Sequence, residues 1–412
     1  GNWEVKVKTT LEVSPQTIQL KSKDSYILIE DVLFGEVWLC SGQSNMEMPL
    51  KGYQGQPIFG STEAILKANN KNLRLFQVVK VGTKKPLKNF AEKSKWEISN
   101  PESATAFSAI GFFFGMQLQE TLQVPVGIIH ASWGGSPVQA WMSEETLQAL
   151  EPIDWQKHNF KEKLNQTPTA LFNGMIHPII NYHIKGALWY QGENNRGKFN
   201  LYKTLLPAMV KEWRAKWNVG DFPFYFVQIA PFHYQKLDAF DAPANSAFMR
   251  EAMVECVALI PNSGIAITTD LGSDKTIHPP KKIEIAHRLL LNALNQTYGM
   301  KNIAYKGPEL KDFTVNENTI ELHFQVSGFG LYSNGDLTAF EIAGEDRVFY
   351  PANATIFKYR SIKVSSEKVT KPVAVRYAWS NYIEGNLYNS NLLPASSFRT
   401  DQWEKATRAT QN

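Results

Sequence analysis

Cysteine is scarce in this sequence. The 412 residues include two cysteines, Cys40 and Cys256, which excludes a framework of several disulfide bonds. The eight histidines are scattered, and neither they nor the cysteines stand at a spacing typical of a zinc site. We therefore expect no metal ion and no cofactor.

The sequence also lacks a large excess of charge of either sign. The chain carries 43 Lys and Arg against 39 Asp and Glu, a formal net charge of +4, with no run of five or more basic residues. This pattern is typical of a mixed solvated surface and disfavours a nucleic-acid partner. No apolar stretch is long enough to span a membrane. The chain opens without a signal peptide, so we expect either a removed signal or a truncated N-terminus.

Aromatic residues, in contrast, are plentiful. The 11 Trp and 15 Tyr residues could line a sugar-binding cleft, because sugar faces rich in C–H groups pack on aromatic rings, or they could fill a core. A length of 412 residues suits one large catalytic domain and a smaller second domain, since single cores stop growing near about 250–300 residues.

Two kinds of strand pattern divide the chain into three parts. Residues 1–34 and 301–412 alternate apolar and polar residues, as half-buried antiparallel strands do. Residues 35–300 instead hold short, continuous apolar runs, at 37–40, 126–129, 186–190, 224–227 and 264–267. Helical patterns lie between these runs, at about 107–122, 199–217, 241–258 and 280–296.

The alternation of strands and helices predicts an α/β fold over residues 35–300, with a parallel sheet sandwiched by helices. We expect an accessory β domain, formed by the strands of residues 301–412 together with those of residues 1–34. In open parallel sheets, ligands bind beyond the carboxyl ends of the strands. The residues directly after each apolar run are therefore the candidates for function.

The first two of these loops contain a serine and a pair of glycines. Ser44, preceded by Gly42, could be a nucleophile on a sharp turn whose backbone N–H groups face an oxyanion, or it could be a helix N-cap. Gly134 and Gly135 could bring a backbone N–H close to a ligand, or they could form a plain tight turn.

The other two loops contain an amide and a histidine. Gln191 or a following Asn could donate a hydrogen bond to a tetrahedral intermediate, although polar residues at a strand end are often only solvated. His278, between Ile277 and Pro279, could act as general base to a serine, although a loop histidine often has no catalytic role. Because all four loops fall at strand ends of one sheet, together they favour a serine hydrolase.

Several blocks of the sequence resemble the sialate O-acetylesterase family within the SGNH hydrolase superfamily. The blocks are residues 35–49, which include Gly42-Gln43-Ser44-Asn45, and residues 133–137, 140–141, 173–176, 186–195, 277–282, 340–344, 372–379 and 393–401. They run over essentially the whole chain, although family members usually carry a longer N-terminal β region. The resemblance implies an SGNH-hydrolase-like, flavodoxin-like sheet and a serine esterase that removes acetyl groups from a carbohydrate.

The resemblance also implies roles for individual residues. His278 removes the proton of Ser44, and Ser44 attacks the acetyl carbonyl. The oxyanion is met by the N–H groups of Ser44 and Gly135 and by the side-chain amide of Gln191. Gly134 and Asn195 are the alternatives for the second and third donors.

One position departs from the superfamily pattern. SGNH enzymes carry an Asp three residues before the histidine, and here that position is Lys275. We expect Asp274 to orient His278 through a bulged loop, with Asp270 or a backbone carbonyl as the alternatives.

The expected substrate is an O-acetylated sialic acid, and acetylated xylan is the alternative, since nothing in the sequence determines the sugar. An Arg in the cleft would favour the sialate carboxylate, so Arg196 and its neighbour Asn195 are the candidates for substrate binding, although Arg196 could also be a solvated surface residue. A non-catalytic carbohydrate-binding protein is the alternative class, but it would require Ser44 or His278 to be missing. A glycan substrate predicts a secreted or periplasmic location, and the oligomeric state stays open.

Overall fold

A seven-stranded sheet forms the centre of the protein in the computed structural model, which describes residues 9–10, 12–90, 94–158, 160–234, 245–403 and 406–409. In order across the sheet the strands are β5 (Trp96–Ser99), β4 (Asn70–Gln77), β6 (Val126–Ser132), β3 (Glu36–Gly42), β7 (Gly186–Tyr190), β8 (Phe224–Val227) and β9 (Ser263–Ala266). All neighbours pair in parallel except β4 and β5. From β6 to β9 the order, counted along the chain, is 2-1-3-4-5, which is the flavodoxin-like order.

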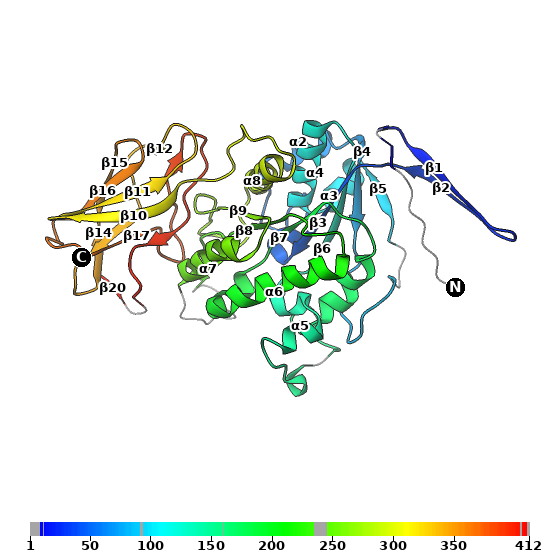
Figure 1. The fold of residues 1–412 in the computed structure, drawn as a ribbon, viewed down its shortest axis with the longest axis horizontal. Helices are drawn as coiled ribbons and strands as arrows, with labels where there is room; N and C mark the ends of the chain where they lie inside the picture. Colours follow the sequence, from blue (N-terminus) through cyan, green and yellow to red (C-terminus); the bar gives the residue numbers. More distant parts are fainter. Residues whose placement is uncertain are drawn as a thin grey trace.

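Helices cover both faces of this sheet (Figure 1). On one face lie α4 (Ala109–Leu122) and α8 (Lys282–Asn292), and on the other lie α6 (Phe199–Trp217) and α7 (Ser246–Leu259). Trp38 joins the core under α4 and α8, and its neighbour Leu39 joins the core under α6 and α7. Because both faces are buried, strands such as β3 read as continuous apolar runs.

The predicted strands and helices of residues 35–300 are present, within a few residues of the expected bounds. Residues 241–244 of one predicted helix lie outside the described residues. Strands β4 and β5 were not expected. In β4 the side chains of Leu73 and Leu75 are buried between more exposed neighbours, so this strand lacks the continuous apolar run of a central strand.

Short helices and turns complete the α/β domain. They are α1 (Ser44–Glu47), α2 (Ser61–Leu66), α3 (Pro101–Ala106), α5 (Glu144–Gln148), η1 (Val138–Trp141), η2 (Trp155–Lys157), η3 (Phe172–Ile176), η4 (His177–Ile179), η5 (Glu193–Lys198) and η8 (Ala293–Thr297). The last of these extends α8. Among the described residues, no helix is both long and apolar enough to cross a membrane.

The C-terminal part is a sandwich of two antiparallel sheets. One contains β10 (Glu309–Asn316), β11 (Thr319–Gln325), β16 (Ser361–Ser365) and β15 (Asn353–Phe357). The other contains β19 (Phe398–Arg399), β17 (Ala374–Tyr377), β13 (Phe340–Ala343), β14 (Val348–Pro351) and β20 (Thr407–Arg408), of which β20 alone pairs in parallel. A short pair, β12 (Leu331–Tyr332) and β18 (Tyr388–Asn389), lies beside them. The two larger sheets share one apolar core, which includes Leu322 and Ile342.

The sandwich is joined to the α/β domain through α7. Arg250 is fully buried and donates hydrogen bonds to the carbonyl oxygen of Ala378 at 2.9 Å and to Oγ of Ser397 at 2.8 Å. The next residue along α7, Glu251, pairs with Arg399 at 2.9 Å. The two charged side chains that α7 contributes to this junction thus have partners, as buried charges need.

The N-terminal strands do not join this sandwich, and here the expectation was wrong. Within the residues that the structure describes, strands β1 (Gln16–Lys21) and β2 (Tyr26–Val32) pair only with each other, and they lie at the opposite end of the molecule (Figure 1). A turn closed between Ser22 and Ser25 makes this local pairing easy to form. Asp31 pairs with Arg74 of β4 at 2.8 Å, which ties the hairpin to the α/β domain. Residues 1–8 and 11 lie outside the described part.

Candidate active site

The turn that carries Ser44 is held between two neighbouring strands. At Gly42 the backbone has φ +137°, and an added Cβ would lie 2.1 Å from the carbonyl oxygen of Tyr190, so only glycine fits. Gln43 then donates its N–H to that carbonyl at 2.9 Å. Ser44 starts α1 directly above the boundary of β3 and β7, which is the switch point where open parallel sheets bind ligands.

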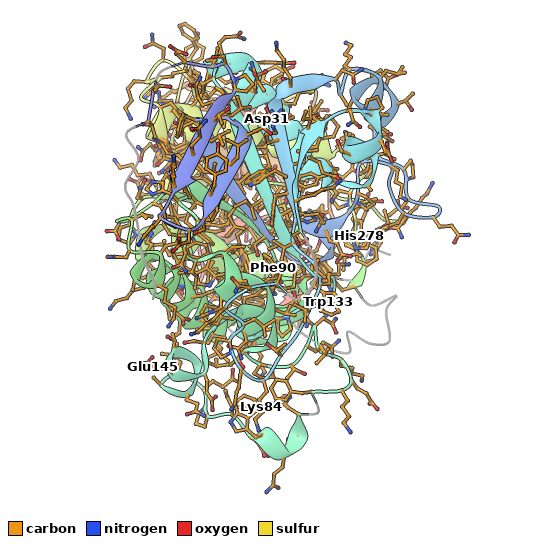
Figure 2. The ribbon with its side chains drawn as sticks, turned by 90° about the vertical axis from the view of Figure 1, so that its right-hand side faces the viewer. Asp31, Lys84, Phe90, Trp133, Glu145 and His278 are labelled. Carbon is orange, nitrogen blue, oxygen red and sulfur yellow. The ribbon has the colours of Figure 1, made fainter. Side chains whose placement is uncertain are left out.

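His278 faces Ser44 from the loop between β9 and α8. Its Nε2 atom lies 2.9 Å from Oγ of Ser44, although 234 residues separate the two in sequence. In Figure 2, His278 and Trp133, the residue before the glycine pair, lie on the same side of the view. Burial, and secondly the charge of Lys282, lower the pKa of His278 to about 4. The imidazole is therefore neutral at physiological pH, as a general base must be.

Gln56 holds the other nitrogen of this ring. Its Oε1 atom lies 2.7 Å from Nδ1 of His278 and also accepts a hydrogen bond from Oγ1 of Thr276 at 2.6 Å. Because the hydroxyl of Thr276 also accepts the backbone N–H of His278 at 3.1 Å, its own proton points to Gln56. An acceptor at Nδ1 places the ring proton there and leaves Nε2 to receive the proton of Ser44.

The two aspartates that were expected near His278 have other positions. Gln56 holds the orienting place that we expected for Asp274, which is exposed on the loop. The reason is that the neighbouring loop brings an amide to Nδ1, so no bulge is needed to reach back from residue 274. The alternative, Asp270, pairs with both terminal nitrogens of Arg288 at 2.7 Å.

The glycine pair, Gly134 and Gly135, lies beside Ser44. The hydrogen bonds of the two N–H groups show which of them is available as an oxyanion donor. Gly134 donates its N–H to the carboxylate of Glu47, which also pairs with Lys80. Among the described residues nothing accepts the N–H of Gly135, whose backbone has φ +69°. The N–H of Ser44, at the start of α1, also has no acceptor in the described part of the chain. Ser44 and Gly135 thus keep the open donors expected of an oxyanion hole.

Gln191 does not have the geometry expected of the third donor. Its Nε2 atom gives its hydrogens to the carbonyl oxygen of Ser136 at 3.1 Å and to Oδ1 of Asn195 at 2.7 Å, which leaves none for an oxyanion. The amide of the intervening Asn194 lies closer to the glycine pair, since its Nδ2 donates to the carbonyl oxygen of Gly135 at 2.7 Å. One of its two N–H groups remains for a ligand.

The two residues expected to bind substrate are buried. Asn195 is 3% exposed, and it bonds Gln139, Gln191 and the backbone N–H of Val138. Arg196 is 2% exposed, with its guanidinium 4.2 Å from the centre of the Tyr234 ring. Both side chains point into the protein, because η5 turns them under the loop rather than over the cleft. Arg196 is therefore not placed to meet a substrate carboxylate.

A buried polar network lies directly beneath Ser44. Asn45 donates to Oε1 of Glu193 at 2.5 Å and to the carbonyl oxygen of Ile277 at 3.1 Å, and its Oδ1 accepts from Nζ of Lys282. One amide thus joins the turn that carries Ser44, the loop after β7 and the loop that carries His278. Burial lowers the pKa of Lys282 to about 7, although the Glu193 carboxylate opposes this shift. Burial likewise raises the pKa of Glu193.

Comparisons with known proteins agree with this geometry. Residues 34–284 match the family described as "Carbohydrate esterase, sialic acid-specific acetylesterase". The chain belongs to this family. The sialate O-acetylesterases of Homo sapiens and Pongo abelii are 30% and 31% identical to it, over 98% of this chain and 80% of their own length. A solved carbohydrate acetylesterase from Xanthomonas citri is 34% identical, with a TM-score of 0.83 over 94% of this chain and 85% of that one.

Two residues of this carbohydrate esterase's candidate site were given no role by the sequence analysis. Gln56 does not directly follow a predicted strand, so it was not among the candidates for function. No sequence pattern links it to His278, which is 222 residues away. Lys282 stands in one of the blocks that resemble the family, which was a signal of importance without a role. Its role becomes visible only when burial and its contact with Asn45 are known.

Proposed function

We propose that the protein is a serine O-acetylesterase that removes acetyl groups from carbohydrates, with Ser44 as nucleophile and His278 as general base. The observation that carries the proposal is the hydrogen-bond distance of 2.9 Å between Oγ of Ser44 and Nε2 of His278, at the switch point of the sheet. A non-catalytic binding protein has no need of this pair.

The reaction begins when Nε2 of His278 takes the proton of Ser44 while Oγ attacks the acetyl carbonyl. The oxyanion accepts hydrogen bonds from the N–H groups of Ser44 and Gly135 and from the second N–H of Asn194. His278 then gives its proton to the departing sugar hydroxyl, which leaves an acetyl group on Ser44. Water, activated by the same imidazole, releases acetate and restores the serine.

The environment of His278 sets the pH range of this chemistry. Because burial and Lys282 lower its pKa to about 4, the neutral base persists into mildly acidic solution. Gln56 orients the ring with a neutral oxygen instead of a carboxylate. The imidazolium formed during the reaction therefore returns its proton readily, which favours expulsion of a poorly acidic sugar alcohol.

The identity of the sugar is the open part of the proposal. The curated relatives are named for sialate, so an O-acetylated sialic acid is one substrate to test, and acetylated xylan is the other. A glycan substrate also underlies the prediction of a secreted or periplasmic location, which stays a prediction.

The test is acetate release from nitrophenyl acetate and from acetylated sugars by the wild-type protein and by Ser44→Ala. We expect kcat to fall by at least about 10³-fold in the variant. A phosphonate esterase inhibitor should in parallel add its mass to the peptide that contains Ser44. Activity that survives in Ser44→Ala, or labelling at another serine, would remove Ser44 from the mechanism.

A further inference from the structure

A cavity of about 410 Å³ lies beside the glycine pair. A Cβ added at Gly134 would lie 3.3 Å from Cβ of Ser44, and one added at Gly135 would lie 4.0 Å from Nε2 of Gln166, which lines the cavity. Asn194, which bonds the carbonyl oxygen of Gly135, lines it as well. The cavity therefore adjoins the place where the acetyl group must sit, and its volume is in the range of about 300–1,000 Å³ typical of small-molecule sites.

One wall of the cavity is a connected row of hydrogen-bonded side chains. Nδ2 of Asn195 donates to Gln139 at 2.9 Å, and Nε2 of Gln139 donates to Glu151 at 2.8 Å. Apolar surface comes from Pro137 and Pro168, which line the cavity too. Such a wall is preformed, so a ligand would not have to order it on binding.

The charged side chains that line the cavity balance one another. Lys198 pairs with Glu151 at 3.1 Å, and Lys157 pairs with Asp154 at 3.0 Å. The cavity therefore offers no excess positive charge to attract a carboxylate. Since Arg196 is buried under Tyr234, it adds none. A polar cavity without net charge fits an uncharged ligand.

Amide groups that could bind hydroxyls face this space. In the described part of the chain nothing bonds the side-chain amide of Gln166, which is exposed, and nothing donates to Oδ1 of Asn194. The amide of Gln166 can both donate and accept, and Oδ1 of Asn194 can accept, which matches the hydroxyl groups of a sugar. The lining residue His158 also lies next to Trp155, with ring centres 6.4 Å apart, so an aromatic face is close by.

We propose that this cavity is a subsite for an uncharged sugar unit next to the acetylated one, so that the substrate is an acetylated neutral oligosaccharide. The proposal rests on the proposed function, because the acetylated unit must lie at Ser44. Gln166 and Asn194 bind the neighbouring sugar through hydrogen bonds, and the apolar wall of Pro137 and Pro168 contacts it.

The first experiment compares substrates of increasing length with the wild-type enzyme. We expect kcat/KM to be about tenfold higher for acetylated xylotriose than for acetylated xylose, the gain that two or three neutral hydrogen bonds provide. O-acetyl sialic acid should have a lower kcat/KM than the trisaccharide. Equal values for the mono- and trisaccharide would overturn the proposal, and so would a preference for the sialate.

The second experiment fills the cavity. Gln166→Trp should reduce the advantage of the trisaccharide over the monosaccharide from about tenfold to about twofold or less. The matched control is Glu145→Trp, an exposed position on α5 far from His278 (Figure 2), which should keep the full advantage. An unchanged advantage in folded Gln166→Trp would place the neighbouring sugar elsewhere. The comparison of substrate lengths decides the proposal even if Gln166→Trp does not fold.

Failure of the subsite and failure of the proposed function give different results. If the proposed function is wrong, Ser44-dependent acetate release is missing for every substrate, including nitrophenyl acetate. If only the subsite is wrong, Ser44-dependent hydrolysis is present, and either kcat/KM does not depend on the length of the sugar or its dependence on length survives in Gln166→Trp.

Discussion

Oε1 of Gln56 lies 2.7 Å from Nδ1 of His278, in the position where a hydrolase triad has a carboxylate. Thr276 donates to the same oxygen at 2.6 Å, which keeps the carbonyl end of the amide, and not its NH₂ end, against the ring. The proposed base is therefore oriented by a neutral group, from a loop that carries none of the other proposed active-site residues.

Replacing Gln56 tests this orientation. Gln56→Ala should lower kcat by about 10–10²-fold, because the ring loses its fixed tautomer while the oxyanion donors remain. Gln56→Glu should keep the ring oriented but raise the pKa of His278, since a carboxylate favours the imidazolium. The measurements are kcat and the pH profile of kcat/KM.

The control for Gln56 is Gln54→Ala, an exposed position two residues earlier in the same loop. It should leave both kcat and the pH profile unchanged. A Gln56→Ala variant as active as Gln54→Ala would show that His278 needs no partner at Nδ1.

The pH profile should reveal the low pKa of the base. Since the pKa of His278 is lowered from 6.5 to about 4, the neutral form predominates down to about pH 4, and kcat/KM should fall only below that value. Lys282→Met removes a positive charge that lowers this pKa, so its acidic limb should move to higher pH. Rates are measured on nitrophenyl acetate between about pH 3 and 9.

Lys281→Met is the matched control, because Lys281 is the exposed neighbour of Lys282 and loses the same charge. Its acidic limb should stay at the wild-type position. An equal shift in both variants would mean that a general loss of positive charge, and not the buried ammonium, sets the pKa.

Asn45 should be important for stability as well as for catalysis. Asn45→Ala leaves Lys282 and Glu193 buried without their common partner, so the free energy of unfolding should fall by about 3–5 kcal/mol. The measurement is urea denaturation. Asn316→Ala, at an exposed position on β10, should change the same free energy by less than about 0.5 kcal/mol. A similar small change at Asn45 would show that water replaces the lost contacts.

The two aspartates of the histidine loop should behave differently. Asp270→Ala removes the carboxylate partner of Arg288, which keeps its hydrogen bond to the carbonyl oxygen of Ile267. The free energy of unfolding should fall by about 2–4 kcal/mol, somewhat less than at a fully buried pair. Asp274→Ala, on the exposed part of the loop, should change stability by less than about 0.5 kcal/mol and leave kcat within about twofold. Loss of kcat in Asp274→Ala with an intact Gln56 would return the orienting role to Asp274.

Much of the fold was predictable because its signals are local. Each central strand is buried on both faces, so continuous apolar runs such as residues 37–40 and 186–190 can be recognised in the sequence as strands. The edge strand β5 and its neighbour β4 lack such runs. The pairing of β1 with β2 depends on a nearby turn and not on any residue of the C-terminal sandwich. Pairing partners are a property of the folded chain, which alternation alone cannot specify.

The site was predictable in part. Ser44 and His278 each follow a buried strand, and parallel strands place their ends together, so proximity of the two follows from the order of the elements. The roles of the amides were not predictable, since Gln191 and Asn195 bond each other within the protein while Asn194 between them faces the glycine pair. Which of these three polar residues points outward depends on the backbone of the loop after β7 and of η5.

The sequence by itself determined the class of sheet and the strand ends that carry the candidate residues Ser44 and His278, because these follow from burial patterns along one stretch of chain at a time. Only the tertiary structure decided that Gln56 orients His278, that Lys282 and Glu193 meet at Asn45, and that Arg196 is buried. The reason is physical: a hydrogen bond or a pKa depends on which groups lie within a few ångströms, and those groups come from loops far apart in sequence.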